Sequence, residues 1–397
     1  MARFTLPRDL YFGKGAIENL KNFKGKKAMI VVGGGSMKRF GFLQKAEDFL
    51  KQAGMEVALY EGVEPDPSVE TVMKGAQAML DFGPDWIVAI GGGSPIDAAK
   101  AMWIKYEYPD CTFEDMCKVF GIPELRKKAK FCAISSTSGT ATEVTAFSII
   151  TDYSKGIKYP IADFEITPDV AIVDSELVYE ASDELSAAHG FEVLAHGIEA
   201  YVSVMHSDYT DSFALSAVKT VFDYLPRSCR NGSDDHEARE KMHNAAAIAG
   251  MAYESTLCGL NSALSHSVSS ETGVSKGIAD AVLLPYTIEF NAAGKVSEAW
   301  PKYGREGAAE RYRQIAAYLG LDAETPAKGV KSLVSAIKKL AKESGVATNF
   351  ESVGTSFLNS VPFMAEKALE DRDMAGNPRA AVASELEELL RKAYSGK

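Results

Sequence analysis

The chain has 397 residues, of which 46% are hydrophobic and 24% charged, and its formal net charge is -11. These proportions are typical of globular proteins and exclude a disordered or fibrous chain, and at about 150 residues per domain the length indicates two or three domains. The acidic balance argues against a nucleic-acid or anionic-membrane partner, because both require a basic surface.

Short apolar runs alternate with amphipathic stretches from residue 22 to about residue 150, which indicates βαβ units and a parallel sheet. We expect buried strands at 26–32, 55–63, 85–90 and 130–137. We expect helices at 42–54, 69–83 and 95–106. Residues 1–183 are therefore predicted to form a doubly wound α/β domain that binds a dinucleotide.

Helical periodicity replaces the β-branched runs after about residue 180, as in segments 184–205 and 237–255. Residues 184–397 are therefore predicted to form an all-α domain.

Three loops that follow predicted strands have the composition of phosphate-binding turns. GGGSPIDAAK (91–100) opens a helix, GGGS (33–36) follows the first strand, and SSTSGTATEV (135–144) is rich in hydroxyls. Glycines let backbone N–H groups approach a pyrophosphate, and a helix N-terminus adds its positive dipole end. The G-x-G-x-x-G spacing is absent, so a plain strand-to-helix turn is the alternative for 91–100. Because the three loops are expected at the carboxyl edge of one sheet, together they predict a nicotinamide dinucleotide site.

The turn after the first predicted strand, residues 33–36, bears on the choice of dinucleotide. A carboxylate after the first strand would bind the ribose 2′-hydroxyl of NAD, but the segment VVGGGSMKR contains no acid. Gly34, Ser36 and Lys38 could instead accept a 2′-phosphate. The sequence therefore favours NADP(H) over NAD(H).

The order of several motifs resembles group III, iron-containing alcohol dehydrogenases, in particular the butanol dehydrogenase and aldehyde reductase branch, over nearly the whole chain. The motifs are LYFGKGAIENL (10–20), GGGSPIDAAK (91–100), STSGTATEV (136–144), ITPDVAIVD (166–174), GFEVLAHGIEAY (190–201), AVLLPYTIEFN (281–291) and NPR (377–379). The resemblance implies a dehydroquinate synthase-like fold, a nicotinamide cofactor and hydride transfer to or from a small alcohol or aldehyde.

The same resemblance implies roles for individual residues. Those expected at the pyrophosphate and nicotinamide are Gly92, Gly93, Ser94 and Asp97. Those expected at the phosphates and riboses are Thr137, Ser138, Thr140 and Lys158.

The family's metal site is only partly present. The resemblance implies an aspartate and three histidines around a divalent ion that acts as a Lewis acid. Glu192 and His196 occupy the first two ligand positions, one helical turn apart, but Ser262 and Lys276 stand at the other two. A neutral hydroxyl is a poor ligand and an ammonium has no lone pair, so we expect iron or zinc to bind weakly or not at all.

Two catalytic hypotheses follow from this substitution. Lys276 would place its ammonium at the vacated metal position, pair with Glu192 and polarise a carbonyl, and His266 would relay a proton to the substrate oxygen. The alternatives are a solvated Lys276, an ordinary interface histidine at His196, or a one-turn slip that recruits His266 as a third ligand.

The sequence thus predicts an NADP(H)-linked oxidoreductase with weakened or absent metal dependence. The alternative is a catalytically impaired dinucleotide-binding protein or assembly subunit, and a dehydroquinate synthase-like lyase is disfavoured because that family's polar substrate-binding set is missing. We expect a cytoplasmic homo-oligomer, with a dimer that pairs through the N-terminal segment as the favoured state, and no membrane or nucleic-acid partner.

Overall fold

The chain folds into two compact units, residues 1–179 and 180–397. The computed structural model describes residues 3–230, 234–293 and 307–396. The boundary that the sequence predicts, between residues 183 and 184, lies in the first turn of helix α6 (Asp183–Val202).

The first unit is built on a six-stranded parallel sheet with the strand order β1-β8-β5-β4-β2-β3. The strands are β1 (Asp9–Phe12), β2 (Lys27–Val32), β3 (Glu56–Tyr60), β4 (Trp86–Gly91), β5 (Lys130–Ser135) and β8 (Val170–Val173). The α-helices of this unit are α1 (Ser36–Arg39), α2 (Phe42–Gln52), α3 (Val69–Phe82), α4 (Gly93–Glu107) and α5 (Phe113–Met116). Short 3-10 helices occur at η1 (Ala16–Asn22), η2 (Phe164–Ile166) and η3 (Ser175–Val178).

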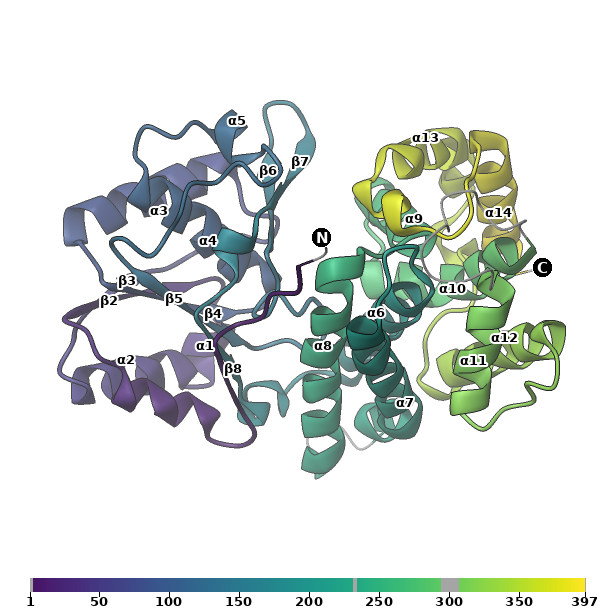
Figure 1. The fold of residues 1–397 in the computed structure, drawn as a ribbon, viewed down its shortest axis with the longest axis horizontal. Helices are drawn as coiled ribbons and strands as arrows, with labels where there is room; N and C mark the ends of the chain where they lie inside the picture. Colours follow the sequence, from purple (N-terminus) through teal and green to yellow (C-terminus); the bar gives the residue numbers. More distant parts are fainter. Residues whose placement is uncertain (1–2, 231–233, 294–306, 397) are drawn as a thin grey trace. The chain divides into compact units, whose positions relative to one another are not determined.

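Helices cover both faces of this sheet (Figure 1), and successive strand residues supply the two faces in turn. On β2, Met29 and Val31 join the core under α3 and α4, whereas Ile30 and Val32 join the core under η1 and α2. This alternation follows from the two-residue period of a strand. Because both faces are buried, the central strands are apolar throughout, as the sequence pattern predicts.

A second sheet was not foreseen. Strands β6 (Phe147–Asp152) and β7 (Ile157–Ala162) form an antiparallel hairpin after the loop 136–146.

Strand β1 was expected as an edge that pairs with another subunit, and within the chain it pairs with β8, with Asp9 opposite Val170. The oligomeric state stays a prediction.

The second unit is helical, as the sequence predicts. Its α-helices are α6 (Asp183–Val202), α7 (Asp208–Arg230), α8 (His236–Thr256), α9 (Leu260–Thr272), α10 (Lys276–Ala293), α11 (Ala308–Tyr318), α12 (Pro326–Glu343), α13 (Ser356–Glu370) and α14 (Ala383–Ser395). Its short 3-10 helices include η5 (Glu351–Val353) and η6 (Arg372–Gly376).

Helix α6 is the centre of this unit, and residues 190–202 of it are buried throughout. Glycines allow its neighbours to approach closely. A Cβ on Gly197 would lie 2.9 Å from Val218 of α7, and a Cβ on Gly277 would overlap the backbone oxygen of Ala188. The first turn of α10 therefore lies directly against the backbone of α6.

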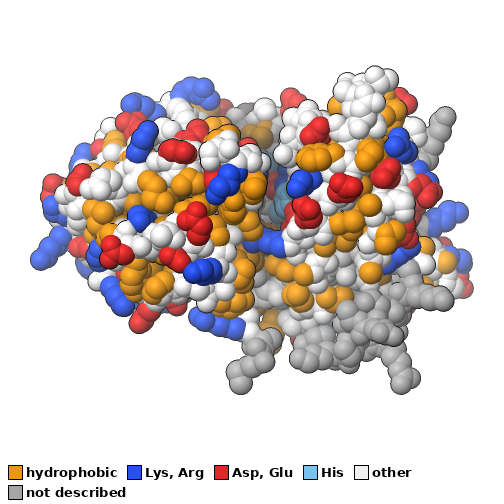
Figure 2. Space-filling model, turned by 90° about the horizontal axis from the view of Figure 1, so that it is seen from above, with side chains coloured by type: hydrophobic (Ala, Val, Ile, Leu, Met, Phe, Trp, Pro, Cys, Tyr) orange, Lys and Arg blue, Asp and Glu red, His pale blue; other side chains and the backbone are white. Residues whose placement is uncertain are grey.

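The surface carries charged side chains of both signs. On the face drawn in Figure 2, acidic and basic side chains are interspersed and neither sign forms a continuous field. Among the described residues, no helix is both long enough and apolar enough to cross a bilayer.

We predict that Gly277→Ala destabilises the helical unit, because the new methyl group would push α10 away from the Ala188 backbone. Overpacking of this kind costs about 1–3 kcal/mol, so the free energy of unfolding should fall by about that amount in urea titrations followed by circular dichroism. Gly35→Ala is the matched control, since that position has a φ of -72° and no atom within 4 Å of the added Cβ. Equal stabilities of the two variants would contradict the close approach.

Candidate functional site

Three loops of the first unit lie at one edge of the sheet. Strands β2, β4 and β5 are parallel neighbours, so their carboxyl ends, followed by residues 33–35, 92 and 136–146, lie together. The chain passes from β2 outward to β3 and then returns to β4 on the other side of β2. This reversal makes the gap between β2 and β4 a topological switch point, the usual ligand site of open α/β sheets.

The glycine turn after β4 leaves a helix N-terminus open. Gly92 caps α4 without any side-chain hydrogen bond, and Gly91 has a φ of 148°, a backbone conformation that side chains disfavour. A Cβ on Gly92 would lie 3.1 Å from the Thr137 side chain, and one on Gly93 would lie 3.3 Å from Thr140 Oγ1. Side chains at these positions would fill the space between the two loops, so the residues present suit a bound pyrophosphate.

Asp97 of α4 fixes the loop after β5. Its Oδ1 accepts a 2.6 Å hydrogen bond from Thr142 Oγ1, and its Oδ2 accepts one from the Ile149 amide at 3.2 Å. The sequence did not reveal the role of Lys100, a fully buried residue whose ammonium donates to the carbonyls of Thr142 and Phe147 at 2.7 and 2.9 Å. These bonds hold the backbone around Thr137, Ser138 and Thr140 against α4.

The first turn holds a feature that the sequence did not indicate. Gly34 has no atom within 4 Å of an added Cβ, and Ser36 and Lys38 are exposed on α1. Lys38 Nζ lies 3.3 Å from Glu61 Oε1, just beyond the end of β3. A 2′-phosphate at this turn would compete with Glu61 for the Lys38 ammonium.

Lys158 is on β7 rather than on one of the three loops. Its ammonium donates a 2.6 Å hydrogen bond to Asp66 Oδ1 in the loop after β3. To hold a ribose, Lys158 would have to give up its bond to Asp66 and donate to the ribose hydroxyls instead.

In the second unit the predicted metal-site residues converge on a lysine. Glu192 and His196 are buried on α6, and Lys276 is the first residue of α10. Lys276 Nζ lies 3.8 Å from Glu192 Oε1 and 3.3 Å from His196 Nε2. The ammonium therefore occupies the point on which the two α6 side chains converge.

A carboxylate absent from the sequence-based set completes this cluster. Asp280, fully buried one turn along α10, accepts a 2.9 Å hydrogen bond from Lys276 Nζ. Burial alone would lower the pKa of Lys276, but Asp280 and Glu192 outweigh it and raise that pKa above its ordinary value. Burial holds the pKa of His196 well below its ordinary value, and the positive charge of Lys276 lowers it further, so the imidazole is neutral.

The Ser262 side chain is engaged by a carboxylate outside this cluster. Its hydroxyl donates a 2.6 Å hydrogen bond to Glu199 Oε2, and the amides of Asn261 and Ser262 donate to Glu199 Oε1. Burial raises the pKa of Glu199 to about 8.

These residues do not fit a divalent metal. Ser262 and Lys276 offer no ligand, and His196 Nδ1 is buried without a hydrogen-bond partner in the described part of the chain. A metal-bound imidazole almost always donates its second N–H to an acceptor. The donor set is that of an ammonium site.

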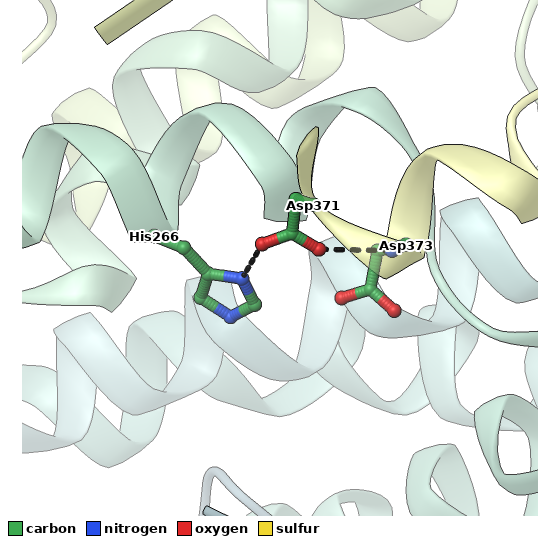
Figure 3. Close-up of side chains that lie close together, drawn as sticks. All are labelled: His266, Asp371 and Asp373. Carbon is green, nitrogen blue, oxygen red and sulfur yellow. Dashed lines mark hydrogen bonds and ion pairs between the residues drawn. The ribbon is translucent and has the colours of Figure 1, made fainter. Parts of the chain in front are cut away.

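His266 belongs to a separate group on α9 and η6. Its Nδ1 lies 2.9 Å from Asp371 Oδ2, and Asp371 Oδ1 accepts from the Asp373 amide at 2.8 Å (Figure 3). Within the described residues, His266, Asp371 and Asp373 are the group spaced closely enough to share an ion, with ligand atoms within 4.8 Å of one another. Burial is the largest single effect and raises the pKa of Asp371, but the hydrogen bond and charge of His266, the Asp373 amide and the charge of Arg372 together outweigh it, so the pKa of that carboxyl is lowered. The geometry is that of an imidazole oriented by a carboxylate, with Nε2 directed away from Asp371.

Comparisons with known proteins place both halves of the chain in one family. Residues 7–175 match "Iron-containing alcohol dehydrogenase", and residues 186–394 match "Fe-containing alcohol dehydrogenase family, C-terminal". The chain is 50% identical to the NADPH-dependent butanol dehydrogenase of Clostridium saccharobutylicum, covering 100% of this chain and 99% of the relative. It is 40% identical to the aldehyde-alcohol dehydrogenase of Streptococcus pneumoniae, but spans only 46% of that protein.

Solved structures give the same result. The iron containing alcohol dehydrogenase from Thermococcus thioreducens is 36% identical, with a TM-score of 0.89 and 100% of both chains covered. The predicted dehydroquinate synthase-like fold is therefore confirmed. The family's name implies iron, so the comparisons do not support the expected weakness of metal binding, and that expectation rests on this chain's own side chains.

We predict a pH-dependent stability from Glu143 in the loop after β5. This carboxyl is 1% exposed, its Oε2 has no partner among the described residues, and burial raises its pKa to about 7 from 4.5. An unfolded chain ionises Glu143 near pH 4.5 whereas the folded chain keeps the proton, so stability is lost as the pH rises between these values. The free-energy advantage of Glu143→Gln over the wild type should grow by about 3 kcal/mol across this window.

Urea titrations at several pH values between 4.5 and 7 would measure this difference. The exposed Glu114→Gln is the control and should parallel the wild type. A Glu143→Gln profile that also runs parallel would disprove the assignment.

Proposed function

The chain belongs to the iron-containing alcohol dehydrogenase family, and on that premise we propose that it transfers a hydride between NADP(H) and a small alcohol or aldehyde. Alcohol and aldehyde oxidoreduction is the activity for which its relatives are named, and the chain is an oxidoreductase of this class. The observation that carries the cofactor assignment is the glycine-lined space between the loops after β4 and β5.

The first unit would hold the dinucleotide with its backbone and hydroxyl groups. The open N-terminus of α4 at Gly92 and Gly93 binds the pyrophosphate, aided by the Ser94 hydroxyl. The hydroxyls of Thr137, Ser138 and Thr140 bind phosphate and ribose. Asp97 holds their loop in place, and Lys158 exchanges Asp66 for the nicotinamide ribose.

NADP(H) is the form that the first turn favours. The loop 33–36 carries no acid, Lys38 supplies a cation, and a relative 50% identical is NADPH-dependent. Glu61 moderates this preference, because it neutralises part of the charge that a 2′-phosphate would meet.

The helical unit would act on the substrate oxygen. When bound, the reduced nicotinamide supplies the hydride that reduces the carbonyl carbon. His266 donates a proton from Nε2 to the oxygen, and Asp371 fixes the ring by bonding to Nδ1. In alcohol oxidation the same imidazole accepts that proton.

A dinucleotide-binding protein without catalysis is the second candidate. The engagement of Ser262 by Glu199 and of Lys276 by Asp280 favours it, because neither side chain can serve as a metal ligand. The two candidates differ in whether bound NADPH is oxidised by an aldehyde.

We predict that the purified chain oxidises NADPH in the presence of short aliphatic aldehydes, followed at 340 nm. His266→Gln should lower kcat by about 100-fold, the usual contribution of a general acid, and leave the Kd for NADPH unchanged. Binding of NADPH without any oxidation across a panel of aldehydes would instead establish the second candidate.

We predict that Lys38→Ala weakens NADPH binding by about tenfold, the loss of one charge-assisted contact of about 1.4 kcal/mol, and leaves NADH binding within about twofold. Glu61→Gln should shift the preference further towards NADPH because it frees Lys38. Fluorescence titrations with both cofactors measure this, and Lys51→Ala on α2 is the control for a surface charge. Equal effects of Lys38→Ala on NADPH and NADH would rule out a 2′-phosphate contact.

A further inference from the structure

We propose that Lys276, fixed by Asp280, is the resident cation of the helical site, that it takes the place of the family's divalent ion, and that this chain works without a catalytic metal. The role in catalysis rests on the proposed function. The absence of a metal site and the part played by Asp280 are independent of it.

The position of the ammonium excludes a metal on the two retained ligands. A divalent ion lies about 2.0–2.1 Å from an imidazole nitrogen. Lys276 Nζ lies 3.3 Å from His196 Nε2 and 3.8 Å from Glu192 Oε1, so it stands in the space such an ion would need. Two cations cannot share that space, and Lys276 has no lone pair to offer while protonated.

Asp280 explains why Lys276 stays there. It lies one turn along α10, is fully buried, and bonds to the ammonium through Oδ2 at 2.9 Å. Its other oxygen accepts a 3.0 Å bond from Asn261 Nδ2, and Asn261 Oδ1 accepts from Thr287 at 3.2 Å. Asp280 is therefore held rigidly, and it acts as a positioning residue for Lys276.

The longest of the three contacts leaves a donor for substrate. At 3.8 Å the pair with Glu192 is an ion pair without a hydrogen bond, and the Lys276 side chain is 21% exposed. One N–H can therefore turn to a carbonyl oxygen while Asp280 and His196 keep the nitrogen in place. Asp280 and Glu192 offset part of the positive charge, so the polarisation is weaker than that from a divalent ion.

The chemical step balances without a metal. The dihydronicotinamide is oxidised as its hydride bonds to the carbonyl carbon, and the carbonyl π bond breaks towards oxygen. Lys276 stabilises the oxygen by donating a hydrogen bond and keeps its own proton. His266 supplies the proton that completes the alcohol.

Removal of the ammonium tests the catalytic part. Lys276→Met should lower kcat/KM for aldehyde by about 100-fold or more, as loss of one preorganised donor does, with the Kd for NADPH unchanged. Lys219→Met is the matched control, because Lys219 pairs with Asp223 at the same i, i+4 spacing on the surface of α7, and it should leave activity unchanged.

The positioning role of Asp280 is tested by kcat and NADPH affinity, because a loss of stability alone would not distinguish it from a structural role. Asp280→Asn should lower kcat by about tenfold or more with little change in NADPH affinity, and Asp280→Glu should recover part of the loss. Equal kcat values for Asp280→Asn and the wild type would show that Asp280 does not position Lys276 for catalysis.

Metal binding tests the site without reference to activity. Wild-type protein titrated with Zn²⁺ in a calorimeter should show no tight stoichiometric site at Glu192 and His196, and exhaustive chelation should leave its activity intact. The double variant S262H/K276H restores imidazoles at both substituted positions and should bind one Zn²⁺ per chain at least about 100-fold more tightly than the wild type.

The outcomes separate the two proposals. If the wild type binds NADPH but reduces no aldehyde, the proposed function fails while the zinc comparison still decides the cation. Tight Zn²⁺ binding by the wild type that is lost in His196→Ala, or activity that collapses on chelation and returns only with metal, would overturn the lysine proposal. Full activity of Lys276→Met would overturn its catalytic part.

Discussion

The contact between the start of α10 and the middle of α6 determines the chemistry available to the helical unit. Gly277 allows α10 to lie against the Ala188 backbone, and this approach places Lys276 between Glu192 and His196. Asp280 then holds the ammonium from behind, so a buried carboxylate supplies the charge balance that a protonated amine needs away from water. In the loop after β5, by contrast, the buried Lys100 ammonium is satisfied by the backbone carbonyls of Thr142, Thr145 and Phe147.

Much of the fold could be predicted from the sequence, because strands buried on both faces appear as continuous apolar runs. The strands between residues 26 and 137 and the helices α2, α3 and α4 agree with their predicted ranges to within a few residues, whereas the four-residue helices α1 and α5 were not predicted. The helical second unit was also predicted. The strands that were missed are β6, β7 and β8. Strand β8 has four residues, β7 is exposed at its first two residues, and β6 carries three polar residues among its six, so none of them gives a long apolar or alternating run.

The candidate site was readable only where chemistry follows from spacing along the chain. Glycine turns after strands, and Glu192 with His196 one helical turn apart, can be recognised in one dimension. Asp280, Glu199, Glu61 and Asp371 could not be, because their partners lie on other elements or their role depends on burial. An i, i+4 pair such as Lys276 and Asp280 is usually a solvated surface contact, and only its complete burial on the carboxylate side gives it another meaning.

In the helical unit, we propose, the Lys276 ammonium stands in place of the family's divalent ion. A crystal structure with NADP⁺ and a short alcohol, grown with excess Zn²⁺ and measured at the zinc absorption edge, tests it most directly. We expect the alcohol oxygen to lie within hydrogen-bonding distance of Lys276 Nζ, with no anomalous peak beside His196. A zinc peak bonded to Glu192 and His196, with the Lys276 side chain displaced from Asp280, would contradict it.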